Sequence, residues 1–301
     1  MEVTSLDLSI LEDEISDLKD GHVQKVYQRG NELTIEVYVG GEGKKRLVIG
    51  TDHAFISKYK RDNPQKPPGF AMELRKHLGK VTDIKQKGFD RILVLESGEV
   101  TFIAEMFGRG NFILTKENKI IGALREEKWA DREIRVGLEY EFPEPVKDPR
   151  ESDSYFDLMD EGEIVRRLAS DLSLGGTYAE EICKRTEIEK DSDIKDLQED
   201  EKERVIEEID KLLYGERKPT VYFEDLPVRS SPFPLQTYSD YDSEEFDTYS
   251  EAVDEFYYRK EKQEEERKLR EKYEEGMSGL QNKKEQQERK IEGLKKSAEQ
   301  N

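Results

Sequence analysis

Leu33-Thr34-Ile35-Glu36-Val37-Tyr38-Val39 alternates apolar and polar side chains and ends at Gly40-Gly41. Successive side chains of a strand point to opposite faces, so this period of two predicts a β-strand with one buried face. Shorter segments of similar character lie on either side, at residues 23–27 and 45–49, and glycines separate all three. The region is therefore predicted to form an antiparallel meander with one face in the core.

A helix is predicted before this sheet and a second set of strands after it. Residues 5–18 carry Leu and Ile at roughly helical spacing, and Asp20-Gly21 closes that segment. After a proline-rich break, residues 70–78 are predicted to form a short helix that ends at Gly79. Further strands are predicted at residues 81–86, 91–96, 100–106, 111–115 and 120–124. Together these elements predict a β-rich first domain with two helices, residues 1–149.

Residues 150–215 are predicted to form a helical second domain, because strand alternation stops and helical periodicity appears at 164–168, 179–182 and 201–213. Within it, residues 172–179 resemble a helix-hairpin-helix motif. The backbone N–H groups of Gly175, Gly176 and Thr177 are predicted to hold a phosphate, since such groups bind anions in hairpins and at helix N-termini. The alternative is an ordinary helical hairpin with glycine in its turn.

The last third of the chain divides into a strand-and-loop segment and a long helix. Residues 216–250 contain the strand-like stretch Thr220–Phe223 and are expected to return and complete the first sheet. Residues 251–301 are predicted to form one coiled-coil helix, with a seam made of Tyr273, Met277, Leu280, Ile291 and Leu294. So polar a helix needs a partner strand. We expect either a fragment whose return helix is missing or coiled-coil self-association.

Composition restricts the setting of the protein. The chain has 70 acidic and 50 basic residues, a net charge of −20, which argues against nucleic acid unless a local basic patch survives. A salt-rich cytoplasm is another explanation of the acidic surface. One cysteine excludes an intrachain disulfide. The N-terminus lacks secretory-signal features and no apolar run approaches bilayer length, so a soluble, cytoplasmic protein without membrane contact is expected.

No constellation of catalytic residues stands out. The three histidines lie outside metal-ligand spacing and no phosphate-loop sequence is present, so no catalytic residue, metal or cofactor is predicted. Two basic groups remain as candidates. Arg75-Lys76-His77 ends a predicted helix, where cations also suit the helix dipole. Asp90-Arg91 precedes a predicted strand, where an Asp in a turn is ordinary but the Arg could pair with phosphate.

Several blocks of the sequence resemble the NFACT N-terminal domain found in fibronectin-binding protein A and RqcH proteins of bacteria, in eukaryotic NEMF and in archaeal relatives. The blocks are Ser5–Leu8, Val23–Gln28, Pro67–Leu78, Gly88–Ile92 and Glu105–Leu114. The resemblance implies a non-enzymatic ribosome quality control factor. Such a factor binds large ribosomal subunits with peptidyl-tRNA, holds tRNA of the alanine type and supports alanine tailing of stalled chains. The peptide bond itself is made by the ribosome.

The resemblance also implies an α+β fold and a set of site residues. The β-rich domain is expected to be similar to formamidopyrimidine-type DNA glycosylases, but Met1-Glu2-Val3 lacks their N-terminal proline, so no lyase chemistry is expected. Asp7, Asp90 and Arg91 match positions used for tRNA engagement and tailing. RNA contacts are also implied for Arg75, Lys76, His77, Gly108, Gly110 and Asn111, the last three as a tight turn with an exposed amide.

The family continues into a second coiled-coil arm and a C-terminal RNA-binding domain, so the chain is expected to be truncated in its first arm. Alternatives are a nucleic-acid-binding glycosylase relative and a surface adhesin.

Overall fold

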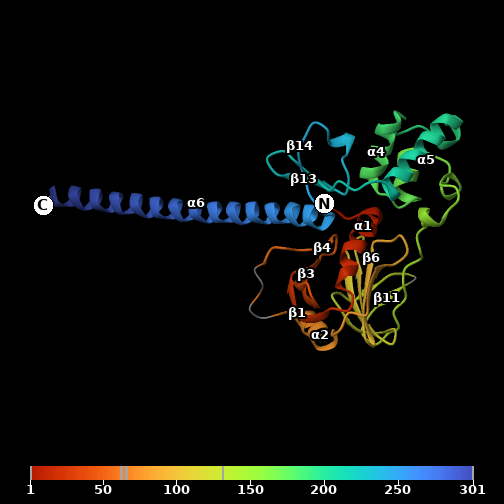
Figure 1. Cartoon of the computed structure of the whole chain (residues 1–301). Helices are drawn as coiled ribbons and strands as arrows, with labels where there is room; N and C mark the ends of the chain where they lie inside the picture. The colour runs from red at the N-terminus through yellow and green to blue at the C-terminus, as the bar shows by residue number, and fades with distance from the viewer. Residues whose placement is uncertain (1, 62–63, 65–66, 131, 300–301) are drawn as a thin grey trace. The chain divides into compact units, whose positions relative to one another are not determined.

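The computed structural model describes residues 2–61, 64, 67–130 and 132–299; the side chains of 292–294 and 296–299 are not described. The chain forms two compact units, Met1–Phe256, called unit 1 below, and Tyr257–Asn301, called unit 2. Figure 1 shows unit 1 as a mixed α and β body and unit 2 as a single helix. The predicted mixture of a β-rich front and a long C-terminal helix is confirmed.

Unit 1 begins with helix α1 (Ser5–Ile15), whose first turn is closed by a capping box between Thr4 and Asp7. The predicted meander follows as an antiparallel sheet in the order β1-β2-β3-β4. Its strands are β1 (His22–Arg29), β2 (Glu32–Val39), β3 (Gly43–Ile49) and β4 (Ala54–Ile56). The apolar positions of the Leu33–Val39 stretch are all buried, as their alternation predicts.

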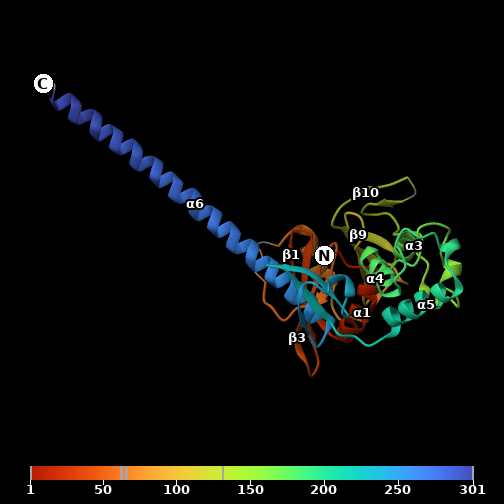
Figure 2. The ribbon, with the colours of Figure 1, turned by 90° about the horizontal axis from the view of Figure 1, so that it is seen from above.

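A second antiparallel sheet has five strands in the order β5-β6-β7-β8-β9. Its strands are β5 (Asp83–Gln86), β6 (Ile92–Ser97), β7 (Val100–Glu105), β8 (Asn111–Lys116) and β9 (Lys119–Ala123). Helix α1 contacts β4 of the first sheet and β5 of the second, which explains why its apolar residues are buried on more than one face. Helix α2 (Gly69–His77) contacts β1 and β9. A short hairpin, β10 (Glu127–Lys128) with β11 (Glu133–Ile134), projects at the edge of unit 1 (Figure 2).

The helical segment contains α3 (Ile164–Ser170), α4 (Gly176–Thr186) and α5 (Glu199–Tyr214). Helix α4 packs against both others, and its residues Tyr178 and Ile182 are completely buried. Short 3-10 turns connect these helices: η2 (Pro149–Glu151), η3 (Phe156–Leu158) and η4 (Ile194–Asp196). The change from strands to helices after residue 149 is confirmed. The division of the first 250 residues into three domains stays a prediction.

Residues 216–250 do not complete the first sheet, so that expectation is wrong. They form a separate three-stranded sheet of β12 (Thr220–Phe223), β13 (Pro227–Ser231) and β14 (Asp242–Glu245), in the order β13-β12-β14. A short 3-10 turn, η5 (Gln236–Tyr238), lies between β13 and β14. Both edges of β12 are paired locally, one with each neighbour, so no edge of this strand remains for another sheet.

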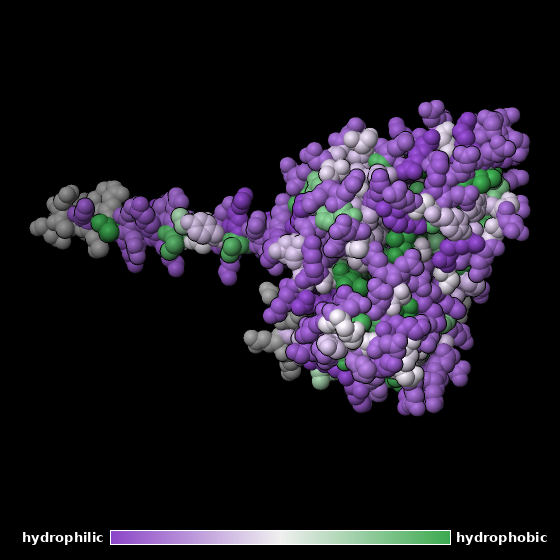
Figure 3. Space-filling view, in the orientation of Figure 1, coloured by the Kyte–Doolittle hydropathy of each residue, from purple (hydrophilic) through white to green (hydrophobic). Residues whose placement is uncertain are grey.

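The long helix α6 (Tyr249–Glu299) begins inside unit 1, where Tyr249, Val253 and Phe256 are buried. Along unit 2, five large apolar side chains are exposed among polar ones (Figure 3); they are Leu269, Tyr273, Met277, Leu280 and Ile291. The side chain of Leu294, the last predicted seam residue, lies outside the described residues. Within the described chain, no helix combines the length and the apolar character needed to cross a membrane.

A buried histidine connects the first sheet to the loop before β4. The ring nitrogens of His53 lie 2.7 Å from Asp52 Oδ1 and 3.1 Å from Glu32 Oε2. Arg61 also faces Glu32, with Nη1 3.6 Å from Oε2. Burial alone lowers the pKa of His53, but the hydrogen bonds and charges of the two carboxylates outweigh burial and raise this pKa above its ordinary value. The folded chain therefore favours the charged imidazolium.

This pair of contacts gives a pH dependence of stability. The pKa of His53 is raised above its unfolded value of about 6.5, so the stabilisation is fully present below that pH. It is lost as pH rises through the folded pKa. We expect the free energy of unfolding to fall over this range, and His53→Gln to flatten the fall. Urea unfolding of both proteins between about pH 6 and pH 8 measures the difference. If the unfolding free energies of wild type and His53→Gln changed equally with pH, the stabilisation by charged His53 would be contradicted.

Candidate functional site

One cavity brings together the predicted Asp90-Arg91 pair and the predicted phosphate-binding hairpin. It has a volume of about 510 Å³ and is called the α4 cavity below. Its walls come from the chain start before α1, the turn between β5 and β6, the α3–α4 hairpin and strand β13. The lining residues are Glu2, Val3, Thr4, Ser5, Asp90, Arg91, Val146, Ala169, Ser170, Ser173, Gly175, Gly176, Thr177 and Arg229.

The N-terminus of α4 opens into this cavity without a capping side chain. Gly175, the N-cap residue, has φ +79°, and a Cβ placed there would lie 2.7 Å from Thr4 Cγ2, so both backbone and space require glycine. The N–H groups of Gly176, Thr177 and Tyr178 have no intrahelical acceptor because they belong to the first turn. Gly176 and Thr177 line the cavity. Unpaired N–H groups and the helix dipole make this wall attractive to an anion.

Asp90 and Arg91 form another part of the wall, at the turn that enters β6. Asp90 Oδ1 accepts a 2.7 Å hydrogen bond from the Arg91 backbone N–H, and burial raises the pKa of the Asp90 carboxyl. Gln86 Nε2 donates to both Asp90 O and Ser5 O, which holds the turn against α1. The Arg91 guanidinium pairs with Glu2, whose side chain is 61% exposed. An ion pair with so exposed a partner is weak, so Arg91 can exchange Glu2 for a phosphate oxygen.

Arg229 on β13 is a cavity residue that sequence reasoning missed. It is only 7% exposed, its Nη2 lies 3.4 Å from Asp7 Oδ2, and its guanidinium lies over the Tyr178 ring. Its Nε has no hydrogen-bond acceptor among the described residues. A buried cation with an unused donor therefore stands beside the α4 N-terminus. No local pattern marks Arg229, because its partner Asp7 is 222 residues away in the sequence.

Asp7 lies behind the wall of this cavity. The resemblance implied that Asp7 contacts RNA, but its carboxylate has no exposed surface with which to do so. The residue is fully buried. Oδ1 accepts from the hydroxyls of Tyr178 and Tyr249, and Oδ2 accepts from the Thr4 backbone N–H and from Arg229. Burial first, and then the Asp7 charge, raise the pKa of both tyrosine hydroxyls, which stay protonated donors. Asp7 thus positions α4, β13 and the start of α6 around one carboxylate.

The predicted Arg75-Lys76-His77 group does not reach the α4 cavity. Arg75 Nε donates to the Val26 carbonyl at 2.6 Å and its guanidinium lies over the Tyr27 ring, so it serves packing between α2 and β1. Lys76 and His77 line a separate cavity of about 370 Å³ beside the turn that follows β6. Asp90 and Arg91 lie before β6, so the two sites stand at opposite ends of a six-residue strand, about 20 Å apart.

The Gly-x-Gly-Asn element forms the predicted tight turn but not the predicted exposed amide. Gly108 and Gly110 have φ +59° and +63°, and a Cβ on Gly110 would lie 2.3 Å from Thr51 Cβ. Asn111 is only 1% exposed, because its amide donates to Arg125 O and Glu127 Oε2 and accepts from two backbone N–H groups. Its side chain fixes the turn from inside, so the expectation of an exposed amide is wrong.

A protein-family comparison matches nearly the whole chain. The model described as NFACT N-terminal and middle domains matches residues 4–301. Among curated proteins, the archaeal Rqc2 homolog aRqcH of Methanocaldococcus jannaschii is 32% identical over 285 residues, which are 85% of this chain and 42% of that protein. Ribosome quality control complex subunit 2 of Saccharomyces cerevisiae is 31% identical over 147 residues, 46% of this chain and 14% of that protein. Rqc2 homolog RqcH of Bacillus subtilis is 31% identical over 150 residues, 42% of this chain and 26% of that protein.

Two solved structures share the fold. The fibrinogen binding protein from Staphylococcus aureus has a TM-score of 0.67 and 22% identity, and the alignment covers 84% of this chain and 98% of that one. The N-terminal part of the fibronectin/fibrinogen-binding protein from Streptococcus suis has a TM-score of 0.66 and 21% identity, with the same coverage. At this identity the likeness concerns the fold. The chain spans less than half the length of the curated relatives it matches. Because the family model matches residues 4–301 and the archaeal relative is 32% identical, the chain belongs to the NFACT N-terminal and middle domain family, which includes ribosome quality control proteins.

Proposed function

We propose that this chain is the tRNA-holding part of a ribosome quality control factor. In this proposal it binds large ribosomal subunits that carry peptidyl-tRNA, engages tRNA of the alanine type and supports alanine tailing. The observation that supports it most is the α4 cavity, where the uncapped α4 N-terminus, Arg91 and buried Arg229 meet. All three are suited to a phosphate oxygen, and the RNA backbone presents phosphates at regular spacing.

The acidic composition shapes how such binding would work. A net charge of −20 gives no general attraction to RNA, so affinity has to come from local groups that exclude water. The start of α4 suits such local binding, because no side chain caps the helix and its first turn contains no acidic residue that would compete with a phosphate for the backbone N–H groups. We further propose that the α3–α4 hairpin acts as a helix-hairpin-helix element. In the same proposal the protein is an adaptor rather than an enzyme, since peptide-bond formation stays with the ribosome.

The Asp90→Ala/Arg91→Ala double variant tests this proposal. It removes a charge-assisted donor to phosphate, which contributes roughly 1.5–3 kcal/mol, so tRNA affinity is expected to fall about 10- to 100-fold. Both residues lie at a strand entrance and are part-exposed, so the fold is expected to persist. Fluorescence anisotropy of labelled tRNA gives the affinity, and urea unfolding gives the stability.

The Lys76→Ala/His77→Ala double variant is the matched control, because it also removes basic side chains but at the far end of β6. We expect this control to change tRNA affinity less than the Asp90→Ala/Arg91→Ala variant. Equal affinities of wild type and the Asp90→Ala/Arg91→Ala variant, or unfolding of that variant, would refute the assignment.

A further inference from the structure

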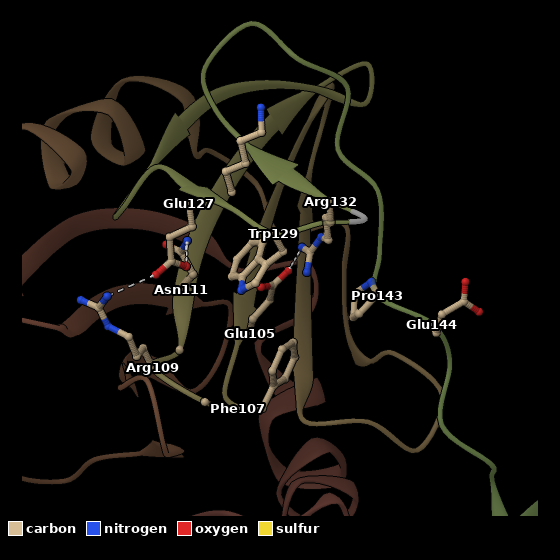
Figure 4. A pocket seen from close by; sticks show the side chains of 12 residues that line it. Glu105, Phe107, Arg109, Asn111, Glu127, Trp129, Arg132, Pro143 and Glu144 are labelled. Atoms are coloured by element: carbon tan, nitrogen blue, oxygen red, sulfur yellow. Dashed lines mark hydrogen bonds and ion pairs between the residues drawn. The ribbon is translucent and has the colours of Figure 1, made fainter.

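A second cavity lies beside the α4 cavity and has a different chemistry. It has a volume of about 770 Å³ and is called the Trp129 cavity below. The β7–β8 turn, the β10–β11 hairpin and the segment at Pro143 and Glu144 surround it (Figure 4). Volumes of several hundred Å³ are typical of sites for small ligands or single monomer units of a polymer.

Aromatic rings stand at the centre of the Trp129 cavity. In Figure 4 the Trp129 indole occupies the middle of the view, with the Phe107 ring below it. Trp129 is 45% exposed, which is unusual for so large an apolar ring within a concave wall. Its backbone N–H donates to Arg132 O at 2.8 Å, and the Arg132 guanidinium lies 5.7 Å from the indole centroid. The hairpin therefore presents a flat aromatic platform inside a cavity.

A buried carboxylate faces the same space. Glu105 is 2% exposed, and its Oε1 accepts hydrogen bonds from both Arg132 and Tyr140. Both of these donors bond to Oε1, so Oε2 is the oxygen that remains for a ligand in the cavity that Glu105 lines. At the rim, the side chains of Arg109 and Lys128 are 80% and 75% exposed and pair only loosely, at 4.0 Å with Glu127 and 3.4 Å with Glu133. The cavity thus offers a ring to stack on, an acceptor in its wall and two exchangeable cations at its mouth.

The β5–β6 turn, which lines the α4 cavity, and the β7–β8 turn, which lines the Trp129 cavity, lie at the same end of the second sheet. The Met106 N–H, at the start of the β7–β8 turn, donates to the Arg91 carbonyl at 2.8 Å. The segment that lines the Trp129 cavity with Pro143 and Glu144 reaches the α4 cavity at Val146. Three extended residues span at most about 10 Å, so the linings of the two cavities come within that distance of each other.

We propose that the Trp129 cavity is a base-binding subsite, which takes an unpaired base of the same RNA whose phosphate lies in the α4 cavity. The base stacks on Trp129, and its edge N–H donors face Glu105 Oε2. Guanine fits best, because its N1–H and N2–H₂ give two adjacent donors toward one carboxylate. The adjoining phosphate reaches Arg109 or Lys128. A cationic peptide side chain is the competing occupant, since three carboxylates line the cavity beside its three cations, and the hexapeptide probes below separate the two. This inference rests on the proposed function.

Trp129 is the only tryptophan of the chain, so its fluorescence reports on this cavity alone. The probe is a single-stranded hexaribonucleotide with one central guanine, compared with the same oligonucleotide carrying an abasic residue there. We expect the guanine probe to quench Trp129 at the concentrations at which it binds by anisotropy. The abasic probe and the Trp129→Ala variant are each expected to bind about 5- to 100-fold more weakly, because one stacked base is lost. Trp129→Phe keeps a ring and should recover part of the affinity.

The matched control is Val136→Ala, which removes another exposed apolar side chain from the same region but lies outside the cavity lining. It is expected to bind as wild type does. Oligonucleotide or tRNA binding by anisotropy without a change in Trp129 fluorescence overturns the subsite and leaves the proposed function standing. Failure of tRNA itself to bind overturns both. Quenching by a phenylalanine-containing or arginine-containing hexapeptide, but not by RNA, assigns the cavity to a peptide and overturns the inference.

Discussion

The Asp7→Ala variant is expected to lose about 3–5 kcal/mol of unfolding free energy, because the substitution leaves a buried charge without its partner. Arg229 is 7% exposed and faces Asp7 Oδ2, so in the variant its guanidinium would remain in the interior uncompensated. The hydroxyls of Tyr178 and Tyr249 would lose their common acceptor as well. Urea unfolding of the whole chain, followed by circular dichroism, measures the loss.

Asp13→Ala is the matched control for this prediction, since Asp13 lies on the same helix but is exposed. Surface substitutions of this kind change stability by about 0.5 kcal/mol or less. Asp7→Asn keeps an acceptor but not the charge and is expected to fall between the two. A loss below about 1 kcal/mol for Asp7→Ala would contradict the picture of Asp7 as the carboxylate that joins α1, α4, β13 and α6.

Thr177→Asp is expected to raise the stability of the protein slightly and to lower its tRNA affinity strongly. Thr177 is the second residue of α4, where a carboxylate favours the helix dipole by about 0.3–1 kcal/mol. The same carboxylate would occupy the wall of the α4 cavity that the proposal gives to a phosphate. Two negative charges about 5 Å apart repel by roughly 3 kcal/mol at an effective dielectric constant of about 20, which corresponds to about 100-fold in affinity. Urea unfolding tests the expected rise in stability, and anisotropy of labelled tRNA tests the expected fall in affinity.

Ser239→Asp carries the same change of net charge at an exposed position outside the α4 cavity, and is the control. We expect it to leave tRNA affinity within a few-fold of wild type. If Thr177→Asp bound tRNA as tightly as Ser239→Asp, the α4 N-terminus would not be a phosphate site. A purely structural role for this hairpin predicts that stability and affinity change together, whereas the phosphate site predicts opposite directions.

The parts of the fold that the sequence predicted are those set by local patterns. Alternation identified β2, and the helical spacing of Leu and Ile residues identified α1. Asp90-Arg91 was singled out by the family resemblance and Gly175–Thr177 by the helix-hairpin-helix pattern, and the binding role of both stays a prediction. The short strands β4, β10 and β11 were missed, because two or three residues carry no readable period. The glycosylase likeness stays a prediction.

What the sequence could not predict depends on contacts between distant segments. The family resemblance implied tRNA engagement by Asp7, and nothing near Asp7 in the sequence shows that Tyr178, Arg229 and Tyr249 converge on it. Arg75 looked like an RNA contact until its partner Val26 was visible, 49 residues earlier. Trp129 gave no signal, since one tryptophan in a polar loop is compatible with any surface role. Each case joins residues that only the tertiary fold brings together.

Crosslinking from the rim of the α4 cavity tests most directly where RNA lies. The chain's one cysteine, Cys183, is buried, and burial raises the pKa of its thiol to about 11, so it reacts poorly with thiol reagents. Ser170 lines the α4 cavity and is exposed, which suits Ser170→Cys for a short photocrosslinker that leaves the cavity open. Ser239→Cys carries the same reagent elsewhere. We expect bound tRNA to crosslink from position 170 and only weakly from position 239. Equal yields from both positions, or none from 170 while tRNA is bound, would contradict the account.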